Sequence, residues 1–176
     1  KVERTFTRAA AGGTGYAKAA GNYASSLYPS MLARKEGYDQ LLWTDAKEHE
    51  FIEESGTMNA MFVINGTLVS PMTSETILDG VTRDSVLQLA KDLNIPVEVR
   101  RITVKELRNG LANREVTEAF GVGTAATIKP IEEIGIDGIN YPLAAANPSV
   151  SSRLLNELDS IRRGRLEDRH NWNIPV

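Results

Sequence analysis

The sequence reads Gly12-Gly13-Thr14-Gly15-Tyr16-Ala17-Lys18-Ala19-Ala20-Gly21-Asn22-Tyr23 near its start, and this stretch places one lysine between a glycine-rich turn and an expected helix. Few neighbours could pair the charge of Lys18, so this lysine could act as a desolvated nucleophile that forms a Schiff base with a carbonyl compound. Tyr23 could donate its phenol to the same site. The alternative is a plain turn followed by a solvated lysine, because glycine clusters mark turns far more often than active sites.

A phosphate-binding nucleotide loop is a third interpretation of this stretch, and the residues beside the lysine argue against it. Such a loop requires the pattern Gly-x-x-x-x-Gly-Lys-Ser/Thr. Here Ala17 precedes Lys18 and Ala19 follows it. The backbone cradle and the magnesium-binding hydroxyl are therefore both missing.

The composition is that of one globular domain. The 176 residues are 41% hydrophobic and 24% charged, which is enough to bury one core. The net charge of -3 argues against a nucleic acid as partner, because such sites need a concentrated basic surface. Acidic residues interrupt the arginines near the C-terminus, and we interpret these as a solvated face: Arg162, Arg163, Arg165 and Arg169.

Cysteine content and hydropathy bear on the cellular compartment of the protein. The chain has no cysteine, which excludes disulfides, thiolate metal sites and a cysteine nucleophile, and fits a reducing cytoplasm. No apolar run approaches the ~20 residues that a membrane span requires. No signal-peptide core follows Lys1, and because an initiator methionine is missing we expect a segment of a longer chain.

Periodicity predicts a mixed α/β domain. We expect helices over residues 22–36, 82–93, 104–111 and 150–163, with Pro29 kinking the first helix or moving its start. Strands are expected over residues 39–43, 59–65, 67–70, 97–102, 115–120 and 125–134, with Gly121 and Gly123 between the last two. Asn65-Gly66 predicts a tight hairpin, because both of its turn residues need a positive φ.

Three further motifs follow the lysine segment along the chain. They are Glu54-Ser55-Gly56-Thr57-Met58-Asn59, Ile77-Leu78-Asp79-Gly80-Val81-Thr82-Arg83 and Phe120-Gly121-Val122-Gly123-Thr124-Ala125-Ala126. With the lysine segment and the tail Asn171-Trp172-Asn173-Ile174-Pro175-Val176, they resemble the branched-chain amino-acid aminotransferases, pyridoxal-phosphate enzymes of fold type IV. The resemblance covers nearly all of this chain but about half of the family's protein. It implies the C-terminal large domain, a mixed sheet or pseudo-barrel surrounded by helices, without the smaller N-terminal domain.

The resemblance implies a role for each polar group around the cofactor ring. Lys18 would hold pyridoxal phosphate as an imine and then move a proton between the substrate's α-carbon and the cofactor. Glu54 would keep the pyridine nitrogen protonated, although without the resemblance it would be interpreted as a surface charge. Glu53 should point to the opposite face of the strand. Tyr23 would donate to the cofactor's 3′ oxygen, and its alternative is a core aromatic.

The expected phosphate site lies where the helix over residues 82–93 begins. Unpaired backbone N–H groups and the helix dipole favour an anion there. The resemblance implies that the amides of Val81 and Thr82 and the hydroxyl of Thr124 bind the phosphate. It also implies that Leu78 packs against the ring. An ordinary helix cap is the alternative at this position, and the two interpretations are compatible.

The substrate carboxylate needs hydrogen-bond donors near the lysine. By resemblance, the amides of Thr124 and Ala125 supply them. Thr57, which lies within the Glu54 motif, could help to order the substrate or Tyr23. His49 and His170 match no catalytic position of the family, so we interpret both as surface residues. We expect no metal.

Two departures from the family's pattern limit these predictions. Some members carry a redox-active Cys-x-x-Cys where this chain has Ala126 and Lys129, so we expect no thiol regulation. The family's N-terminal domain supplies an arginine to the phosphate and aromatic residues to the side-chain pocket. Arg4 and Arg8 are not convincing replacements for that arginine.

The resemblance implies a transaminase that moves an amino group between leucine, isoleucine or valine and 2-oxoglutarate. It also implies a cytoplasmic homodimer or higher homo-oligomer, with no nucleic-acid or membrane partner. D-amino-acid aminotransferase and aminodeoxychorismate lyase are alternatives on the same fold, and the segment Ala20-Gly21-Asn22-Tyr23 favours the branched-chain group. The remaining alternative is a non-catalytic domain fragment that binds cofactor weakly or not at all.

Overall fold

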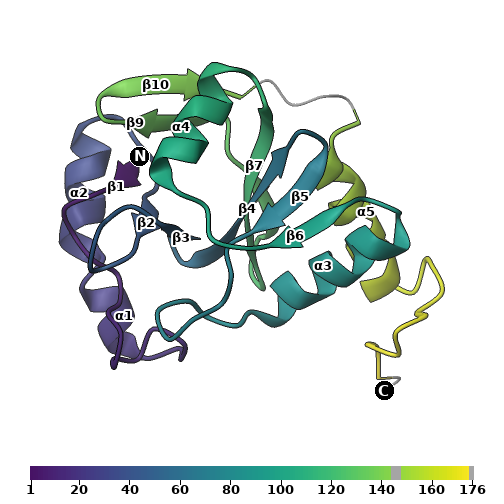
Figure 1. Ribbon diagram of the computed structural model, residues 1–176. Coiled ribbons are helices and arrows are strands. Elements are labelled where there is room, and N and C mark those ends of the chain that lie inside the picture. The colour runs from purple at the N-terminus through teal and green to yellow at the C-terminus, as the bar shows by residue number, and fades with distance from the viewer. Residues whose placement is uncertain (144–147, 175–176) are drawn as a thin grey trace.

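Strands gather into an eight-stranded mixed sheet at the centre of the molecule, with helices around it (Figure 1). The computed structural model describes residues 1–143 and 148–174, so the last two residues of the family-like tail lie outside it. The helices are α1 Ala20–Ala24, α2 Leu27–Lys35, α3 Val81–Asp92, α4 Val104–Ala112 and α5 Val150–Arg162. Among the described residues, none of these helices is long and apolar enough to cross a membrane.

The strands are short and most of them are antiparallel to their neighbours. They are β1 Val2–Glu3, β2 Leu42–Thr44, β3 Ile52–Ser55, β4 Met58–Ile64, β5 Thr67–Ser70, β6 Val97–Val99, β7 Val116–Gly123, β8 Thr127–Pro130, β9 Glu133–Ile136 and β10 Ile139–Pro142. The main sheet runs β1-β2-β3-β4-β5-β6, with β7 also on β4 and β8 on β7. The β1–β2 and β5–β6 pairs are parallel, which confirms the mixed sheet.

Strand β4 organises the sheet because both of its edges are paired. One edge meets β3 at its start and β5 at its end. The other edge runs antiparallel to β7 from Asn59 to Ile64. Strands β9 and β10 form a separate two-stranded hairpin.

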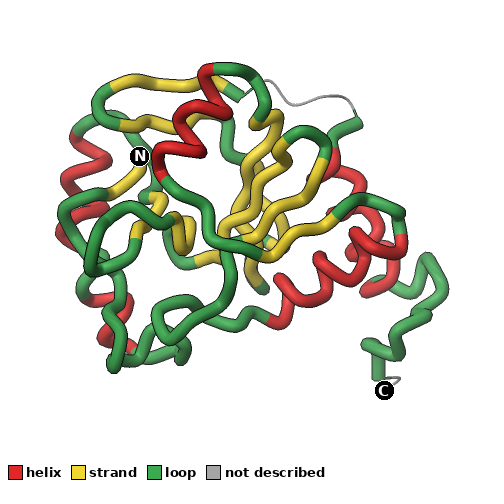
Figure 2. Tube along the Cα trace, in the orientation of Figure 1, coloured by secondary structure: helices red, strands yellow, loops and turns green. Residues whose placement is uncertain are grey.

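The core lies on both faces of β4. Ala60 and Phe62 pack with residues of α4 and β9, whereas Met61 and Val63 pack with residues of α3 and α5. Figure 2 shows the helices flanking the central strands accordingly. A strand that is buried on both faces is expected to be a continuous apolar run. Each large side chain buried here contributes about 1.5–3 kcal/mol of transfer free energy.

Residues with positive φ end several elements where the sequence predicted it. Asn65 and Gly66 have φ of 49° and 78° and form the predicted hairpin turn between β4 and β5. Gly37, with φ of 92°, follows α2, and Asn94, with φ of 55°, follows α3. The hairpin and both helix ends are confirmed.

The predicted continuous helix over residues 22–36 is wrong. The chain leaves the helix after α1 and starts again at α2. The Ser25 hydroxyl donates to the Asn22 carbonyl at 3.2 Å, and the Ser26 hydroxyl donates to the Tyr23 carbonyl at 2.7 Å. These hydroxyls satisfy carbonyls at the break. Pro29 lies in the first turn of α2, where its missing N–H breaks no helical bond, so it moves the helix start.

Three predicted strands have different bounds in the structure. The strand predicted over residues 39–43 is β2, which begins three residues later and ends one residue later, and the strand predicted over residues 97–102 shortens to β6. Beyond β6, the Ile52 N–H donates to the Ile102 carbonyl at 2.9 Å. The residues after β6 therefore no longer pair with β5 and contact β3 instead. Residues 125–134 divide into β8 and β9, because β8 ends at Pro130, which has no N–H to donate.

Gly121 and Gly123 lie inside β7 rather than between two strands, which corrects the sequence prediction. Both face Met58 across the sheet. A Cβ added at Gly121 would lie 3.1 Å from the Met58 sulfur. These two glycines therefore make room for a neighbouring side chain instead of ending the strand.

Candidate active site

Strands β3, β4 and β7 bring two of the sequence motifs to one edge of the sheet, the edge formed by strand ends, where β3 and β7 finish and β4 begins. Because these strands are antiparallel in turn, β3 ends where β4 begins and where β7 ends. Asn59 stands between Glu54 on β3 and Val122 on β7. The turn of residues 124–126 follows β7 at this edge. The Glu54 motif and the Gly-Thr-Ala turn are therefore neighbours.

The loop before α3 is held on the same edge by its backbone. The Leu78 N–H donates to Glu54 Oε1 at 2.7 Å, and Asn59 Nδ2 donates to the Leu78 carbonyl at 2.7 Å. A Cβ at Gly80 would collide with Asn59 Oδ1. Glycine at this position therefore lets α3 begin close against β4, and a third motif joins the site.

The start of α3 presents backbone amides without a side-chain cap. Its N-cap residue is Gly80, which has no side chain that could accept from the first amides of the helix. Val81 is 82% exposed and Thr82 is half-buried. Free N–H groups and the positive end of the helix dipole favour an anion. This end of α3 can accept the phosphate that the resemblance implies.

Glu54 is buried, so its interpretation as a surface charge is wrong. Its exposed fraction is 2%. Burial raises the pKa of Glu54 to about 7, while the Arg8 charge and the Leu78 N–H oppose the rise. The neighbouring Glu53 charge raises the pKa and the Lys18 charge lowers it. A carboxyl placed in this way can change its protonation near neutral pH.

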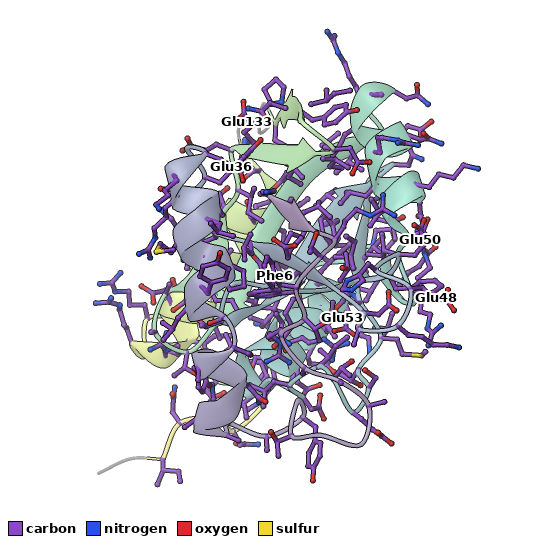
Figure 3. The ribbon with its side chains drawn as sticks, turned by 90° about the vertical axis from the view of Figure 1, so that its left-hand side faces the viewer. Phe6, Glu36, Glu48, Glu50, Glu53 and Glu133 are labelled. Atoms are coloured by element: carbon purple, nitrogen blue, oxygen red, sulfur yellow. The ribbon has the colours of Figure 1, made fainter. Side chains whose placement is uncertain are left out.

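Glu53 takes different partners from Glu54, in line with their predicted opposite directions. Glu53 is 6% exposed, and its Oε1 accepts a hydrogen bond from the Thr76 hydroxyl. Glu53 and Glu48 both line a cavity of about 560 Å³. Figure 3 shows these two acids on the same side of the molecule. None of the predicted cofactor residues lines this cavity.

Lys18 lies in a turn just before α1 and is exposed. The desolvated lysine that the sequence suggested is therefore not formed by this chain alone. Asn22 orders the turn: its Nδ2 donates to the carbonyls of Thr14 and Ala17, both at 2.8 Å. The Thr14 hydroxyl donates to Asn22 Oδ1 at 3.0 Å. Asn22, which we predicted only as part of a motif, thus fixes the backbone that carries Lys18.

The remaining predicted residues lie on exposed turns and helices around this edge. Tyr23 on α1 is 38% exposed, so it is not a core aromatic. Thr124 and Ala125 are exposed in the turn between β7 and β8. Thr57 is exposed in the turn between β3 and β4 and lines a second cavity, of about 450 Å³, with residues of α2 such as Met31.

Arg8 is a residue of the site that the sequence prediction missed. It is 8% exposed, and its Nε lies 3.3 Å from Glu54 Oε2. Its Nη2 donates to the carbonyls of Gly15, at 3.1 Å, and Thr76. No local pattern marks the contacts with Glu54 and Thr76 in advance, because they join residues far apart in sequence.

The mixed sheet and its converging loops are those of the fold-type-IV class of aminotransferases, to which similar solved structures belong. The chain belongs to the amino-transferase class IV family, whose family model matches residues 4–134. It is 43% identical over 176 residues, 99% of its length, to a probable branched-chain-amino-acid aminotransferase of Staphylococcus epidermidis. The chain spans about half the length of the curated relatives it matches.

Solved structures show the same similarity. The branched-chain aminotransferase of Thermoproteus uzoniensis, crystallised with norvaline, aligns with 99% of this chain and 54% of its own, at a TM-score of 0.82 and 31% identity. The branched-chain amino acid aminotransferase of Thermobaculum terrenum in its PLP form aligns with 97% of this chain and 53% of its own. The TM-score is 0.81 and the identity is 28%.

Proposed function

We propose that this chain carries the pyridoxal-phosphate site of a branched-chain amino-acid transaminase, which moves an amino group between leucine, isoleucine or valine and 2-oxoglutarate. One observation carries the proposal. The buried Glu54, the Leu78 backbone and the uncapped start of α3 meet at one edge of the sheet. The similarity to branched-chain aminotransferases, one of them in its PLP form, supports it.

The donors of this edge fit the chemistry of the cofactor. The amides of Val81 and Thr82, with the Thr124 hydroxyl, would hold the phosphate at the uncapped helix end. Leu78 would pack against the ring and Tyr23 would donate to its 3′ oxygen. When bound, pyridoxal phosphate would supply a ring that withdraws electrons from the substrate's α-carbon.

The residues of this chain would then orient the substrate and move its proton. Lys18 would be the residue that holds the cofactor, and once the substrate's amino group has displaced it, its free amine would accept a proton from the α-carbon, since an amine can serve as both base and acid. Glu54 would keep its negative charge beside the ring nitrogen. The amides of Thr124 and Ala125 would bind the substrate carboxylate, and Thr57 would help to order it.

We further propose that residues 1–176 form one cofactor-binding domain and that residues outside it complete the site. The exposure of Lys18 and Val81 supports this, because a closed active site excludes water. The outside residues would include an arginine for the phosphate and aromatic side chains for the substrate pocket. The whole protein would be a cytoplasmic homo-oligomer, and the isolated chain would not turn over.

The full-length protein that contains this chain provides the test. Incubated with pyridoxal phosphate, it should develop the visible absorbance of a lysine-bound cofactor, and Lys18→Ala should abolish that absorbance. Lys91→Ala removes an exposed lysine of α3 and should leave it unchanged. An unmodified protein without this absorbance contradicts the proposal. Faster turnover of D-alanine than of leucine would assign the protein to the D-amino-acid aminotransferases instead.

A further inference from the structure

We infer that Arg8 is a positioning residue of the candidate site, which supplies the counter-charge of Glu54 and fixes the lysine segment against the loop that leads to α3. The effect of Arg8 on catalysis rests on the proposed function. The contacts of Arg8 do not rest on it, because all of them lie within this chain.

One buried guanidinium contacts three segments of the site. Arg8 Nε lies 3.3 Å from Glu54 Oε2 on β3. Its Nη2 donates to the carbonyl of Gly15, in the turn before Lys18, and to that of Thr76, in the loop before α3. Gly15 and Thr76 are also in close contact, because a Cβ added at Gly15 would collide with the Thr76 backbone. Arg8 therefore ties the lysine turn to the segment that bonds Glu54.

The charges that face Glu54 make Arg8 its principal partner. The Leu78 N–H and the Lys18 charge also favour the carboxylate, whereas burial and the Glu53 charge favour the neutral acid. Lys18 is exposed, so water screens its charge. Arg8 is buried, so water screens its charge far less. Without Arg8, an ionised Glu54 would be a buried charge with little compensation, and it would take up a proton instead.

The shape of arginine matters as well as its charge. Its donors point in several fixed directions, so one side chain can face Glu54 and both carbonyls together. A lysine could restore the positive charge but not this fork of contacts. Arg8→Lys therefore separates the electrostatic role from the tethering role.

Under the proposed function, Arg8 would act through Glu54. Only a charged Glu54 can hold a protonated ring nitrogen, and a neutral acid removes that attraction. Arg8 would thus influence the electron demand of the cofactor without touching it.

The test is a carboxyl titration of Glu54 by carbon-13 NMR, in the protein without cofactor. The Glu54 resonance is identified as the one that Glu54→Gln removes. Arg8→Gln should raise the Glu54 midpoint by about 1–3 pH units, the usual effect of a charge at this distance. Arg8→Lys should keep most of the original midpoint but speed amide exchange in the turn before Lys18. An unchanged midpoint in Arg8→Gln overturns the inference.

Arg83→Gln is the matched control. Arg83 is equally buried, but its guanidinium bonds the Ser70 hydroxyl and the Pro71 carbonyl. The Glu54 midpoint should not move in this variant. A shift as large as that of Arg8→Gln would mean that any lost buried arginine disturbs Glu54, and it would also overturn the inference.

A second variant covers the case in which Arg8→Gln does not fold. The double variant Arg8→Gln/Glu54→Gln removes both charges and leaves no unpaired carboxylate. It should fold, and failure to do so contradicts the charge pairing. None of these readouts needs the cofactor. A missing lysine-bound absorbance therefore refutes the proposed function alone, and a fixed midpoint refutes the role of Arg8 alone.

Discussion

At the scale of single residues, the burial of Glu54 makes stability depend on pH. Burial raises its pKa from 4.5 to about 7, so in this window the folded state binds a proton that the unfolded chain releases. The free energy of unfolding must then fall as pH rises from 4.5 to 7. At about 1.4 kcal/mol per pH unit, we predict that the protein loses roughly 3 kcal/mol relative to Glu54→Gln. Urea unfolding at several pH values measures this difference, and parallel pH curves for the two proteins would contradict it.

Asn22 supports a second prediction at the same scale. Its side-chain amide makes three hydrogen bonds to Thr14 and Ala17. Asn22→Ala removes all of them and should lower the free energy of unfolding by about 2–3 kcal/mol, while Thr14→Val removes one and should cost about 1 kcal/mol. Urea midpoints check both values. Equal losses in the two variants would mean that the amide does not order the turn.

Local sequence predicted some of these residues and missed others for a physical reason. Glu54 and the start of α3 were predicted because they belong to short motifs that resemble those of the family, and without the resemblance Glu54 would be interpreted as a surface charge. Arg8 has to meet Gly15, Thr76 and Glu54 together, and that meeting exists only after the sheet has formed. Its burial therefore has no signature in the residues that surround it.

At the scale of elements, α5 depends on a carboxylate from a different strand. Glu118 on β7 accepts hydrogen bonds from the Val150 N–H at 2.6 Å and from the Ser151 N–H at 2.9 Å. It also accepts one from the Ser151 hydroxyl at 2.6 Å. These bonds satisfy helix amides that would otherwise be unpaired, and they place a negative charge at the positive end of the helix.

We therefore predict that Glu118→Ala lowers the free energy of unfolding by about 3 kcal/mol, because buried donors lose a charged acceptor. Thr103→Ala is the comparison. It removes one capping bond, from the Glu106 N–H at the start of α4, and should cost about 1 kcal/mol. Chemical unfolding of both variants checks the ranking. A Glu118→Ala loss no larger than that of Thr103→Ala would show that α5 does not need the carboxylate.

The elements that were predicted well are those specified by their own residues. Helices α3, α4 and α5 begin and end within two residues of the expected bounds, since apolar periodicity and caps are local. The hairpin of β9 and β10 was missed, although Asp137 and Gly138, with φ of 50° and 80°, form the same kind of turn as Asn65-Gly66. The short strand β6 ends early because the chain turns to pair with β3, and that pairing depends on the tertiary structure.

At the scale of the whole molecule, the C-terminal segment returns to α3 and is held there by charge. Asp92 Oδ2 lies 2.6 Å from His170 Nε2 and 2.8 Å from Arg169 Nε. The His170 ring stacks on Trp172, with centroids 4.5 Å apart. His170 is therefore half-buried and bonded rather than a free surface residue, which corrects the sequence interpretation.

This attachment should fail in acid. The hydrogen bonds from His170 and Arg169 lower the pKa of Asp92 from 3.8 to about 2. A depressed pKa means that the stabilisation is complete above 3.8 and is lost as pH falls toward 2. We predict that the Trp172 indole resonance moves to its unstructured position over this range, before the core unfolds. The same release should occur at neutral pH in Asp92→Asn, because the neutral amide carries no charge to attract the Arg169 guanidinium.

Limited trypsin digestion at neutral pH separates this attachment from a general effect of lost charge. Asp92→Asn should increase cleavage after Arg165 and Arg169 several-fold, since a detached segment can enter the protease. Asp159→Asn also removes one carboxylate, but Asp159 pairs only with Arg162 and Arg163 among the described residues. That control should be cut at the rate of the unmodified chain. Equal rates in Asp92→Asn and the unmodified chain would show that other contacts hold the segment to α3.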